Sequence, residues 1–340
     1  MDAHRQPVDP GAVRLELMEL LGGFLRTQAI ATVARLGVAD HVGGDPLEVE
    51  VLAARLGADP SALHRVMRLL ASVGVFSEAA PGAFVATPLS DVLREDRPNS
   101  VRHLAMQQGG PAYRVAGEML ASVQTGRPAA DAVFGMPFFD YLASDPEAAD
   151  VFHRAMAGGA GLRAAAALQH EWQEASVVAD IGGGTGVLLQ TVLQAEPHLR
   201  GVVFDLPEVV ALAGPSIAEA GLSERCETRG GNFFSDPLPD ADVHVLAQIL
   251  HDWDDARAVA ILRNCRRSIA RDGRLLILEQ VLPDGDQPSY GKLLDLLMLT
   301  LLGGKERTEA EFRALLAEGG FELVHVTAGP ATSLVEAVPS

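Results

Sequence analysis

The spacing of hydrophobic residues divides the chain into a helical first part and a second part in which strands and helices alternate. Apolar residues recur at helical spacing near the N-terminus, at Leu17, Leu20, Leu21 and Phe24, and a second apolar helical segment follows over residues 29–36. From residue 177 onward, short β-branched runs predict strands separated by helical patterns. This alternation is typical of an α/β domain with a mainly parallel sheet.

Residues 47–95 have the pattern of a winged helix. Helices are predicted over 49–56 and 61–74, and two short strands at 75–76 and 84–85 flank Pro81-Gly82. A winged helix often binds DNA, but carboxylates outnumber arginines in residues 1–102 and no basic stripe appears. We therefore expect a dimerisation module, in which a partner subunit covers the apolar N-terminal helices.

The segment 98–170 is mostly helical and rich in aromatic side chains. Phe152 and Met156 lie four residues apart and so share one helix face. Two readings of this pair remain open. The two side chains are either ordinary core residues or the wall of a pocket for a flat aromatic substrate.

A glycine-rich turn at residues 180–186 marks a cofactor site. A predicted strand carries Asp180 and runs into Gly182, Gly184 and Gly186, and a helix and a second strand ending in Asp205 follow. A carboxylate about 20 residues after the glycines is placed to bind a ribose. The third glycine is one position too early for a dinucleotide fingerprint, and Asp180 would repel a pyrophosphate. The pattern favours S-adenosylmethionine (SAM), whose amino-acid end carries a cation.

Polar residues follow the later strands of the predicted sheet. The sequence predicts strands over 243–250, 274–278, 321–327 and 333–337, with helices over 293–302 and 309–318. Ligands of open α/β sheets bind at the carboxyl ends of the strands. The residues expected there are Asp180, Asp205, Asn232, His251 and Glu279. Because an imidazole titrates near neutrality, His251 is the candidate general base.

Composition narrows the class of protein. A chain of 340 residues predicts two domains, and the formal charge of −18 argues against nucleic-acid and anionic-membrane partners. Two cysteines, Cys226 and Cys265, are too few for a disulfide framework and lack metal-ligand spacing, so no metal is expected. No apolar run is long enough to span a membrane. We expect a cytoplasmic protein.

Four motifs in order resemble the SAM-dependent O-methyltransferases of the plant caffeic-acid type and their bacterial antibiotic-pathway relatives. They are DIGGGTG at 180–186, FDLPEVV at 204–210, HDWDD at 251–255 and GGKERT at 303–308. The resemblance implies a Rossmann-like SAM-binding domain with a mainly parallel seven-stranded sheet after a winged-helix dimerisation domain. It implies methyl transfer from SAM to a phenolic hydroxyl of a small aromatic natural product by a homodimer.

The resemblance also assigns roles to matching positions. The catalytic set would be His251 as base, with Glu279 and Glu306 flanking its imidazole. The cofactor set would be Asp180, Gly182, Gly184, Gly186, Asp205, Leu206, Asn232, Phe233 and Gln248. The substrate wall would include Phe152, Met156 and Met298.

Two positions depart from the family pattern, and one alternative function stays open. Asn232 replaces a common aspartate, and Ala247 replaces a frequent lysine, so the grip on the cofactor is expected to differ in detail. Some proteins of this fold bind SAM and hydroxylate, decarboxylate or cyclise their substrates.

The predicted boundaries are residues 1–105 for the dimerisation domain, 106–170 for a helical linker that contributes to the substrate pocket, and 171–340 for the SAM-binding domain.

Overall fold

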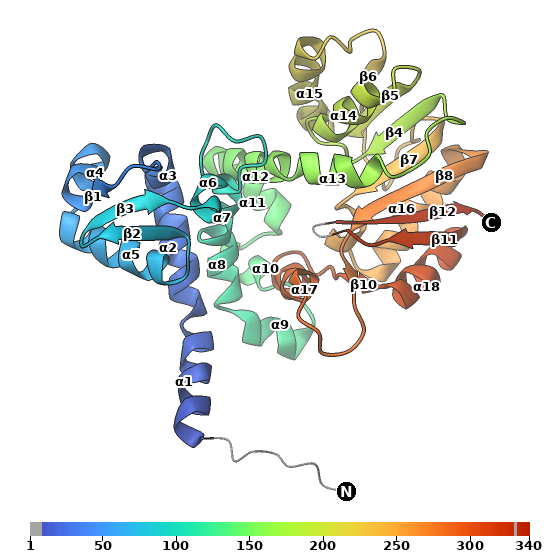
Figure 1. The fold of residues 1–340 in the computed structure, drawn as a ribbon. Coiled ribbons are helices and arrows are strands. Elements are labelled where there is room, and N and C mark those ends of the chain that lie inside the picture. The colour runs from blue at the N-terminus through green and yellow to red at the C-terminus, as the bar shows by residue number, and fades with distance from the viewer. Residues whose placement is uncertain (1–8, 330–331) are drawn as a thin grey trace, which may run out of the picture. The chain divides into compact units, whose positions relative to one another are not determined.

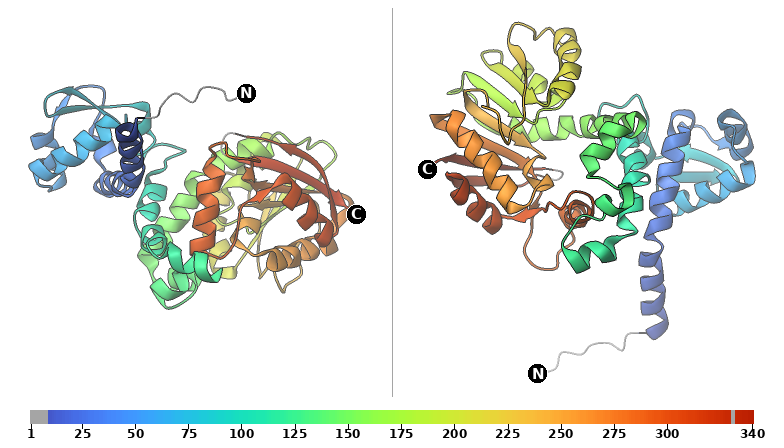
Figure 2. Two further views of the ribbon diagram at one scale, coloured as in Figure 1. Left: turned by 90° about the horizontal axis from the view of Figure 1, so that it is seen from below. Right: turned by 180° about the vertical axis from the view of Figure 1, so that it is seen from behind.

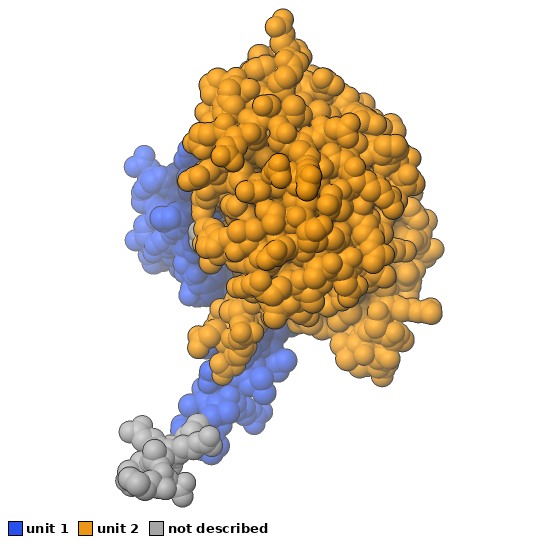
Figure 3. Space-filling model, turned by 90° about the vertical axis from the view of Figure 1, so that its right-hand side faces the viewer, with its two compact units in different colours: residues 1–113, 147–158 blue, residues 114–146, 159–340 orange. Residues whose placement is uncertain are grey.

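The computed structural model describes residues 9–329 and 332–340, which form two compact units (Figure 3). Unit 1 contains residues 1–113 and 147–158, and unit 2 contains residues 114–146 and 159–340. The helical segment predicted as a linker is therefore shared between the units. The predicted boundaries at residues 105 and 170 stay predictions.

Unit 1 begins with two helices separated at Gly22. Helix α1 (Pro10–Leu21) has no buried residue, whereas α2 (Gly23–Leu36) buries Ala29 and Val33 and ends at Gly37. The remaining helices of this unit are α3 (Val38–His41), α4 (Val49–Leu56), α5 (Pro60–Ser72), α6 (Pro88–Asp91), α7 (Arg102–Gln108) and α12 (Pro146–Gly158). Helix α8 (Pro111–Ala116) crosses into unit 2.

The predicted helix–helix–hairpin order of the winged helix is present in unit 1. Helices α4 and α5 precede an antiparallel sheet of order β1-β3-β2, made of Leu47–Glu48, Ala83–Ala86 and Phe76–Ala80 (Figure 1). Leu52, Met67 and Phe84 are fully buried in its core. These residues follow the helical and alternating patterns read from the sequence.

Unit 2 is built on a seven-stranded sheet of order β11-β12-β8-β7-β4-β5-β6. The five strands from β8 to β6 are parallel, and β12 and β11 pair antiparallel at one edge. The mainly parallel seven-stranded sheet predicted from the sequence is confirmed. The strands are β4 (Val177–Ile181), β5 (Arg200–Asp205), β6 (Cys226–Gly230), β7 (Ala241–Ala247), β8 (Ile269–Glu279), β11 (Phe321–Thr327) and β12 (Ser333–Pro339).

Helices cover both faces of this sheet (Figures 1 and 2). One face packs against α13 (Ala160–Ala167), α14 (Val187–Ala195) and α15 (Pro207–Glu219), and the other against α16 (Asp255–Ser268) and α18 (Glu309–Gly319). The remaining elements are α9 (Met119–Thr125), α10 (Ala130–Phe134), α11 (Phe138–Ser144), α17 (Tyr290–Leu301), β9 (Val281–Leu282) and β10 (Arg307–Thr308). No helix of the described residues is long and apolar enough to cross a membrane; the cytoplasmic location stays a prediction.

The strand predicted over 243–250 was too long. β7 ends at Ala247, Gln248 takes a positive φ of 55°, and Leu250–Asp252 form a 3₁₀ turn, η1. The backbone N–H groups of residues 249–251 donate to the Glu279 carboxylate instead of to a neighbouring strand. His251 therefore lies in a turn beyond the strand and not at the strand end.

Candidate active site

The glycine turn after β4 has a backbone that other residues would strain. Gly182, Gly184 and Gly186 have φ angles of 73°, 59° and 74°, in the left-handed region that favours glycine. A Cβ on Gly182 would also collide with the Ile249 side chain, so the turn lies directly against the segment that leads to His251. Gly186 then begins α14 without a side-chain cap.

Asp180 is a buried carboxylate below this turn. Its exposed fraction is 1%, and neither carboxylate oxygen has a hydrogen-bond partner among the described residues. Burial, reinforced by the charge of Asp205, raises the pKa of Asp180 to about 7. An unpaired carboxylate in this position fits a ligand that brings a positive charge.

Arg163 is a basic side chain whose charge acts on Asp180, and the sequence analysis did not identify it. It projects from α13, and its Nη1 donates to Oε1 of Gln248 at 2.8 Å. Burial lowers the pKa of Arg163, and Asp180 opposes that shift. A guanidinium beside the glycine-turn carboxylate suits a ligand that carries both an ammonium and a carboxylate.

The other predicted cofactor residues lie at the carboxyl ends of β5 and β6. Asp205 Oδ2 accepts the Gly184 N–H at 2.8 Å, and its Oδ1 accepts the N–H of the exposed Leu206 at 2.7 Å. Asn232 Oδ1 accepts the Phe234 N–H at 2.9 Å. Phe233 lies near Gly182. These contacts gather the predicted residues around the glycine turn; their roles stay predictions.

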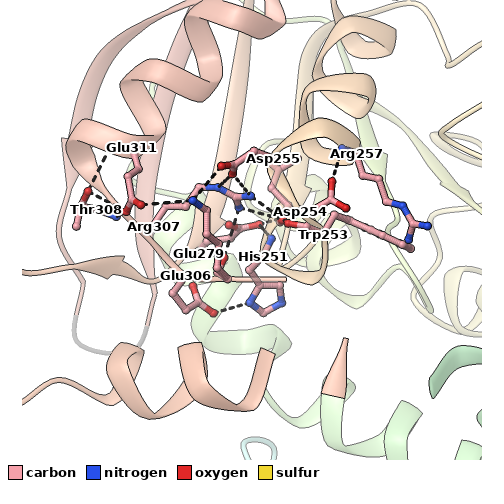
Figure 4. A network of polar contacts seen from close by, with 12 residues as sticks. His251, Trp253, Asp254, Asp255, Arg257, Glu279, Glu306, Arg307, Thr308 and Glu311 are labelled. Carbon is pink, nitrogen blue, oxygen red and sulfur yellow. Dashed lines mark hydrogen bonds and ion pairs between the residues drawn. The ribbon is translucent and has the colours of Figure 1, made fainter. Parts of the chain in front are cut away.

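His251 and Glu306 form a buried pair (Figure 4). Nδ1 of His251 lies 2.6 Å from Oε1 of Glu306, and the two side chains point toward one another. Nε2 lies 3.3 Å from Oδ1 of Asp252. A proton on Nδ1, held by Glu306, leaves Nε2 as the nitrogen that can accept a proton from a substrate.

Glu279, predicted to flank the imidazole, holds the backbone of the turn. Its Oε1 accepts the N–H groups of Ile249, Leu250 and His251 at 3.1, 2.6 and 3.1 Å. The residue is 1% exposed, and burial raises its pKa. Glu279 thus fixes the position of His251 through the main chain and adds negative charge near its ring.

Arg307 holds the carbonyl side of the same turn and is a second residue that sequence reasoning missed. Its guanidinium donates to the carbonyl oxygens of Leu250 and Trp253, both at 3.0 Å, and to Asp255 Oδ1 (Figure 4). The side chain is fully buried. Its place next to Glu306 in the GGKERT motif was the available signal. Five directed donors in one plane suit this task, which a lysine would not reproduce.

Carboxylates dominate the electrostatics of His251. Burial alone would lower its pKa, but Asp252, Glu306 and Glu279 outweigh that effect and raise the pKa to about 9. The raised value brings the imidazole close to a phenol, whose pKa is about 10. Proton transfer from a phenol to His251 therefore costs less than transfer to an ordinary imidazole, while fewer molecules carry the neutral ring at neutral pH.

Glu306→Gln is expected to move the pH dependence of catalysis. Without this carboxylate the pKa of His251 falls, so the neutral imidazole predominates at lower pH and the acidic limb of kcat/KM shifts toward acid. The plateau rate should fall by about 10-fold or more, because the imidazolium formed during proton transfer loses its partner. A kcat/KM profile from neutral to alkaline pH measures both effects. An unchanged limb would contradict the assignment of the base.

The predicted substrate-wall residues lie in different units. Met298 is 5% exposed on α17 in unit 2, whereas Phe152 and Met156 are half-buried on α12 in unit 1. All three roles stay predictions. In unit 2, the ring of Phe139 on α11 stacks at 6.2 Å from that of Trp253, which follows His251 by two residues in the chain.

Comparison with known protein families and structures identifies the class of protein. The O-methyltransferase domain matches residues 117–322, and the O-methyltransferase dimerisation domain matches residues 18–96. This chain belongs to the O-methyltransferase family. The predicted SAM-dependent O-methyltransferase with an N-terminal dimerisation domain is confirmed.

Individual relatives and crystal structures match this chain over nearly its whole length. A phenazine O-methyltransferase of Lysobacter antibioticus is 45% identical, over 97% of this chain and 98% of the relative. The crystal structure of LaPhzM matches with a TM-score of 0.90 and 44% identity, over 98% of this chain and all of that one. A third match is the crystal structure of NcsB1, an O-methyltransferase from neocarzinostatin biosynthesis, in complex with SAM and 2-hydroxy-5-methyl naphthoic acid. Its TM-score is 0.78 and its sequence identity 34%, over 92% of this chain and 96% of that one.

Proposed function

We propose that this O-methyltransferase methylates a phenolic hydroxyl on a small fused-ring aromatic compound, with His251 as general base. The buried His251–Glu306 pair, in the segment that packs against the glycine turn, carries the proposal. Of the relatives described above, one is named for a phenazine, and the crystal structure of another contains 2-hydroxy-5-methyl naphthoic acid. A hydroxylated phenazine is the first acceptor to test.

The residues around the glycine turn fit SAM. The unpaired Asp180 would hold the methionyl ammonium, and Arg163, kept in place by Gln248, would hold the carboxylate. Asp205 would bind the ribose hydroxyls, with Leu206, Asn232 and Phe233 around the nucleoside. Bound SAM would supply an electrophilic methyl group on a sulfonium, and the methyl–sulfur bond would break to leave the neutral thioether S-adenosylhomocysteine. In the described residues, no three His, Cys, Asp or Glu side chains are grouped to hold a metal ion.

The protein's own part in the reaction is alignment and proton removal. His251 takes the phenolic proton at Nε2 as the acceptor oxygen attacks the methyl carbon. Glu306 and Asp252 then stabilise the imidazolium. Glu279 and Arg307 keep the turn from moving while this charge develops. Orientation of the two reactants supplies several kcal/mol of the rate enhancement.

A panel of acceptors tests the proposal. The purified protein is incubated with SAM and, separately, with 1-hydroxyphenazine, a hydroxynaphthoic acid and 3-amino-4-hydroxybenzoic acid, and products are read by mass spectrometry. We expect the mass gain of one methyl group on 1-hydroxyphenazine, with the methyl on oxygen. Turnover of the single-ring acid alone would overturn the fused-ring assignment.

The same panel addresses a second function. One relative, aclacinomycin 10-hydroxylase of Streptomyces purpurascens, is 33% identical over 97% of this chain and 90% of the relative, so the family includes named hydroxylases. A product that gains oxygen in the presence of SAM would favour that chemistry. Retention of that activity in a His251→Ala variant would strengthen it, because such a reaction needs no proton acceptor at Nε2.

We also propose that the homodimer forms through the N-terminal helices. Helix α1 exposes Leu17, Leu20 and Leu21 by 58%, 71% and 66%, and the matched dimerisation domain includes the last two. Exposed leucines in this number on one helix are typical of an interface. The net charge of −18 argues against a nucleic acid as the partner of these helices.

A double substitution, Leu20→Glu with Leu21→Glu, is expected to convert the dimer to a monomer. Four carboxylates would have to be desolvated in the symmetric interface, two from each subunit. Light scattering after size exclusion measures the mass, and Glu19→Gln on the same exposed helix is the control. A dimer that persists in the double variant would place the interface elsewhere.

A further inference from the structure

Asp295 is an isolated carboxylate in the apolar helix α17, and its contact lies outside the helix. Of the other two polar side chains in the body of the helix, Lys292 binds the carbonyl oxygens of Gly285 and Gln287 in the loop just before the helix, and Thr300 binds that of Leu296 within it. Asp295 Oδ1 instead accepts the backbone N–H of Glu306 at 2.9 Å. The carboxylate thus joins α17 to the residue that holds His251.

The chain between Asp295 and Glu306 is fixed at several points. The carbonyl oxygen of Met298 accepts the N–H of Gly303 at 2.8 Å, which folds the chain back at the end of the helix. A Cβ on Gly304 would collide with the backbone at His251 and Asp252, so the loop lies directly on η1. Glu306 follows, with an exposed fraction of 2%.

The backbone position of Glu306 decides whether its carboxylate reaches the imidazole. A contact of 2.6 Å tolerates a displacement of only about 0.5 Å before its geometry is lost. The hydrogen bond from Asp295 holds the N–H of the same residue whose side chain makes this contact. Met298, a predicted wall of the acceptor pocket, lies one helical turn beyond Asp295 on the same element.

We propose that Asp295 is a positioning residue for the His251–Glu306 pair. Its hydrogen bond fixes the position of α17, which carries Met298, relative to that pair. The inference rests on the proposed role of His251 as base. The essential property of Asp295 is an acceptor oxygen at this point of α17. Its negative charge is secondary, because Asp252, Glu279 and Glu306 already surround the imidazole with carboxylates. Tyr290, at the start of α17, is a titratable group of this helix that the charge of Glu306 affects.

Removal and conservative replacement of Asp295 separate the hydrogen bond from the charge. Asp295→Asn keeps an acceptor oxygen, Asp295→Ala removes it, and Asp295→Ser keeps a polar but shorter side chain that serves if the alanine variant does not fold. Asp286→Ala, an exposed site in the loop before α17, is the control. The melting temperature of each variant is recorded first.

The first readout is the titration of His251 in the full-length protein without substrate, followed by NMR with labelled histidine and assigned with His251→Gln. We expect the pKa of His251 to fall toward its ordinary value of about 6.5 in the alanine and serine variants and to stay raised in the asparagine variant. A change in stability alone would not move this pKa. The readout needs no acceptor, so it holds even if the proposed substrate is wrong.

The second readout is kinetic, with SAM and whichever acceptor of the panel is methylated. We expect kcat to fall by about 10-fold to 100-fold in the alanine and serine variants, with KM for SAM unchanged, and to recover in the asparagine variant. The proposal would be overturned if the pKa of His251 and kcat both kept their wild-type values in the alanine and serine variants. Equal losses in the asparagine and alanine variants would also overturn it, because they would assign the effect to the charge.

Discussion

The variant His251→Ala is expected to lower kcat for methyl transfer by about 10²- to 10⁴-fold, the usual contribution of a positioned general base. The phenolic proton would lose its acceptor at Nε2, an imidazole nitrogen whose pKa is raised to about 9 by the surrounding carboxylates. Steady-state kinetics with the acceptor from the panel measures the loss.

Binding of SAM should survive this substitution. The imidazole belongs to η1, whereas most of the predicted cofactor contacts come from the glycine turn and from the ends of β5 and β6, with Gln248 directly after β7. Calorimetric titration with SAM should therefore give the wild-type affinity. His325→Ala, at an exposed position on β11, is the control for loss of a histidine. Near-normal kcat in His251→Ala would exclude the ring as the base.

Asp180→Asn is expected to weaken SAM binding and to stabilise the ligand-free protein. An ammonium that faces a carboxamide loses its ion pair, which corresponds to about 10- to 100-fold in Kd. In the absence of ligand the same carboxylate is desolvated and has no hydrogen-bond partner, so its ionised form opposes folding. The two effects therefore have opposite signs.

The pH dependence of this stabilisation follows from the pKa of Asp180. The folded value is about 7 and the ordinary value 3.8, so the folded state binds the proton more tightly. Stability is then highest below the ordinary value and is lost as pH rises through 7. Asparagine is neutral at every pH. Above pH 7, the free energy of unfolding of the variant should therefore exceed that of the wild type by at most a few kcal/mol, the energy that corresponds to the difference between the two pKa values.

Thermal unfolding with and without SAM measures both effects of Asp180→Asn. Asp240→Asn, an exposed carboxylate before β7, is the control. Unchanged affinity together with higher stability would mean that Asp180 does not face the ammonium. Lower stability at alkaline pH would mean that the carboxylate has a partner in the ligand-free protein.

The sequence determined the class of the fold and the position of the glycine turn. Left-handed backbone is accessible to glycine and to few other residues, so the turn at 182–186 is readable from composition alone. Periodicity placed the strands and helices of both units, because buried faces repeat at fixed spacing. His251 was marked by its place after a predicted strand, whereas Glu306, 55 positions away, was found only because it belongs to a motif of a known family.

Tertiary structure decided how the proposed base is held. Glu279 was expected beside the imidazole, yet its carboxylate lies on the three N–H groups of the turn, a contact that no local pattern encodes. Arg307 and Arg163 were missed because an arginine looks the same in a sequence whether it is solvated or buried. Asp295 is a carboxylate in an apolar helix, and its partner depends on where the chain folds back after Gly303. Periodicity fixes which face a residue occupies, whereas contacts between distant segments depend on packing, and those contacts place the proposed proton acceptor, His251.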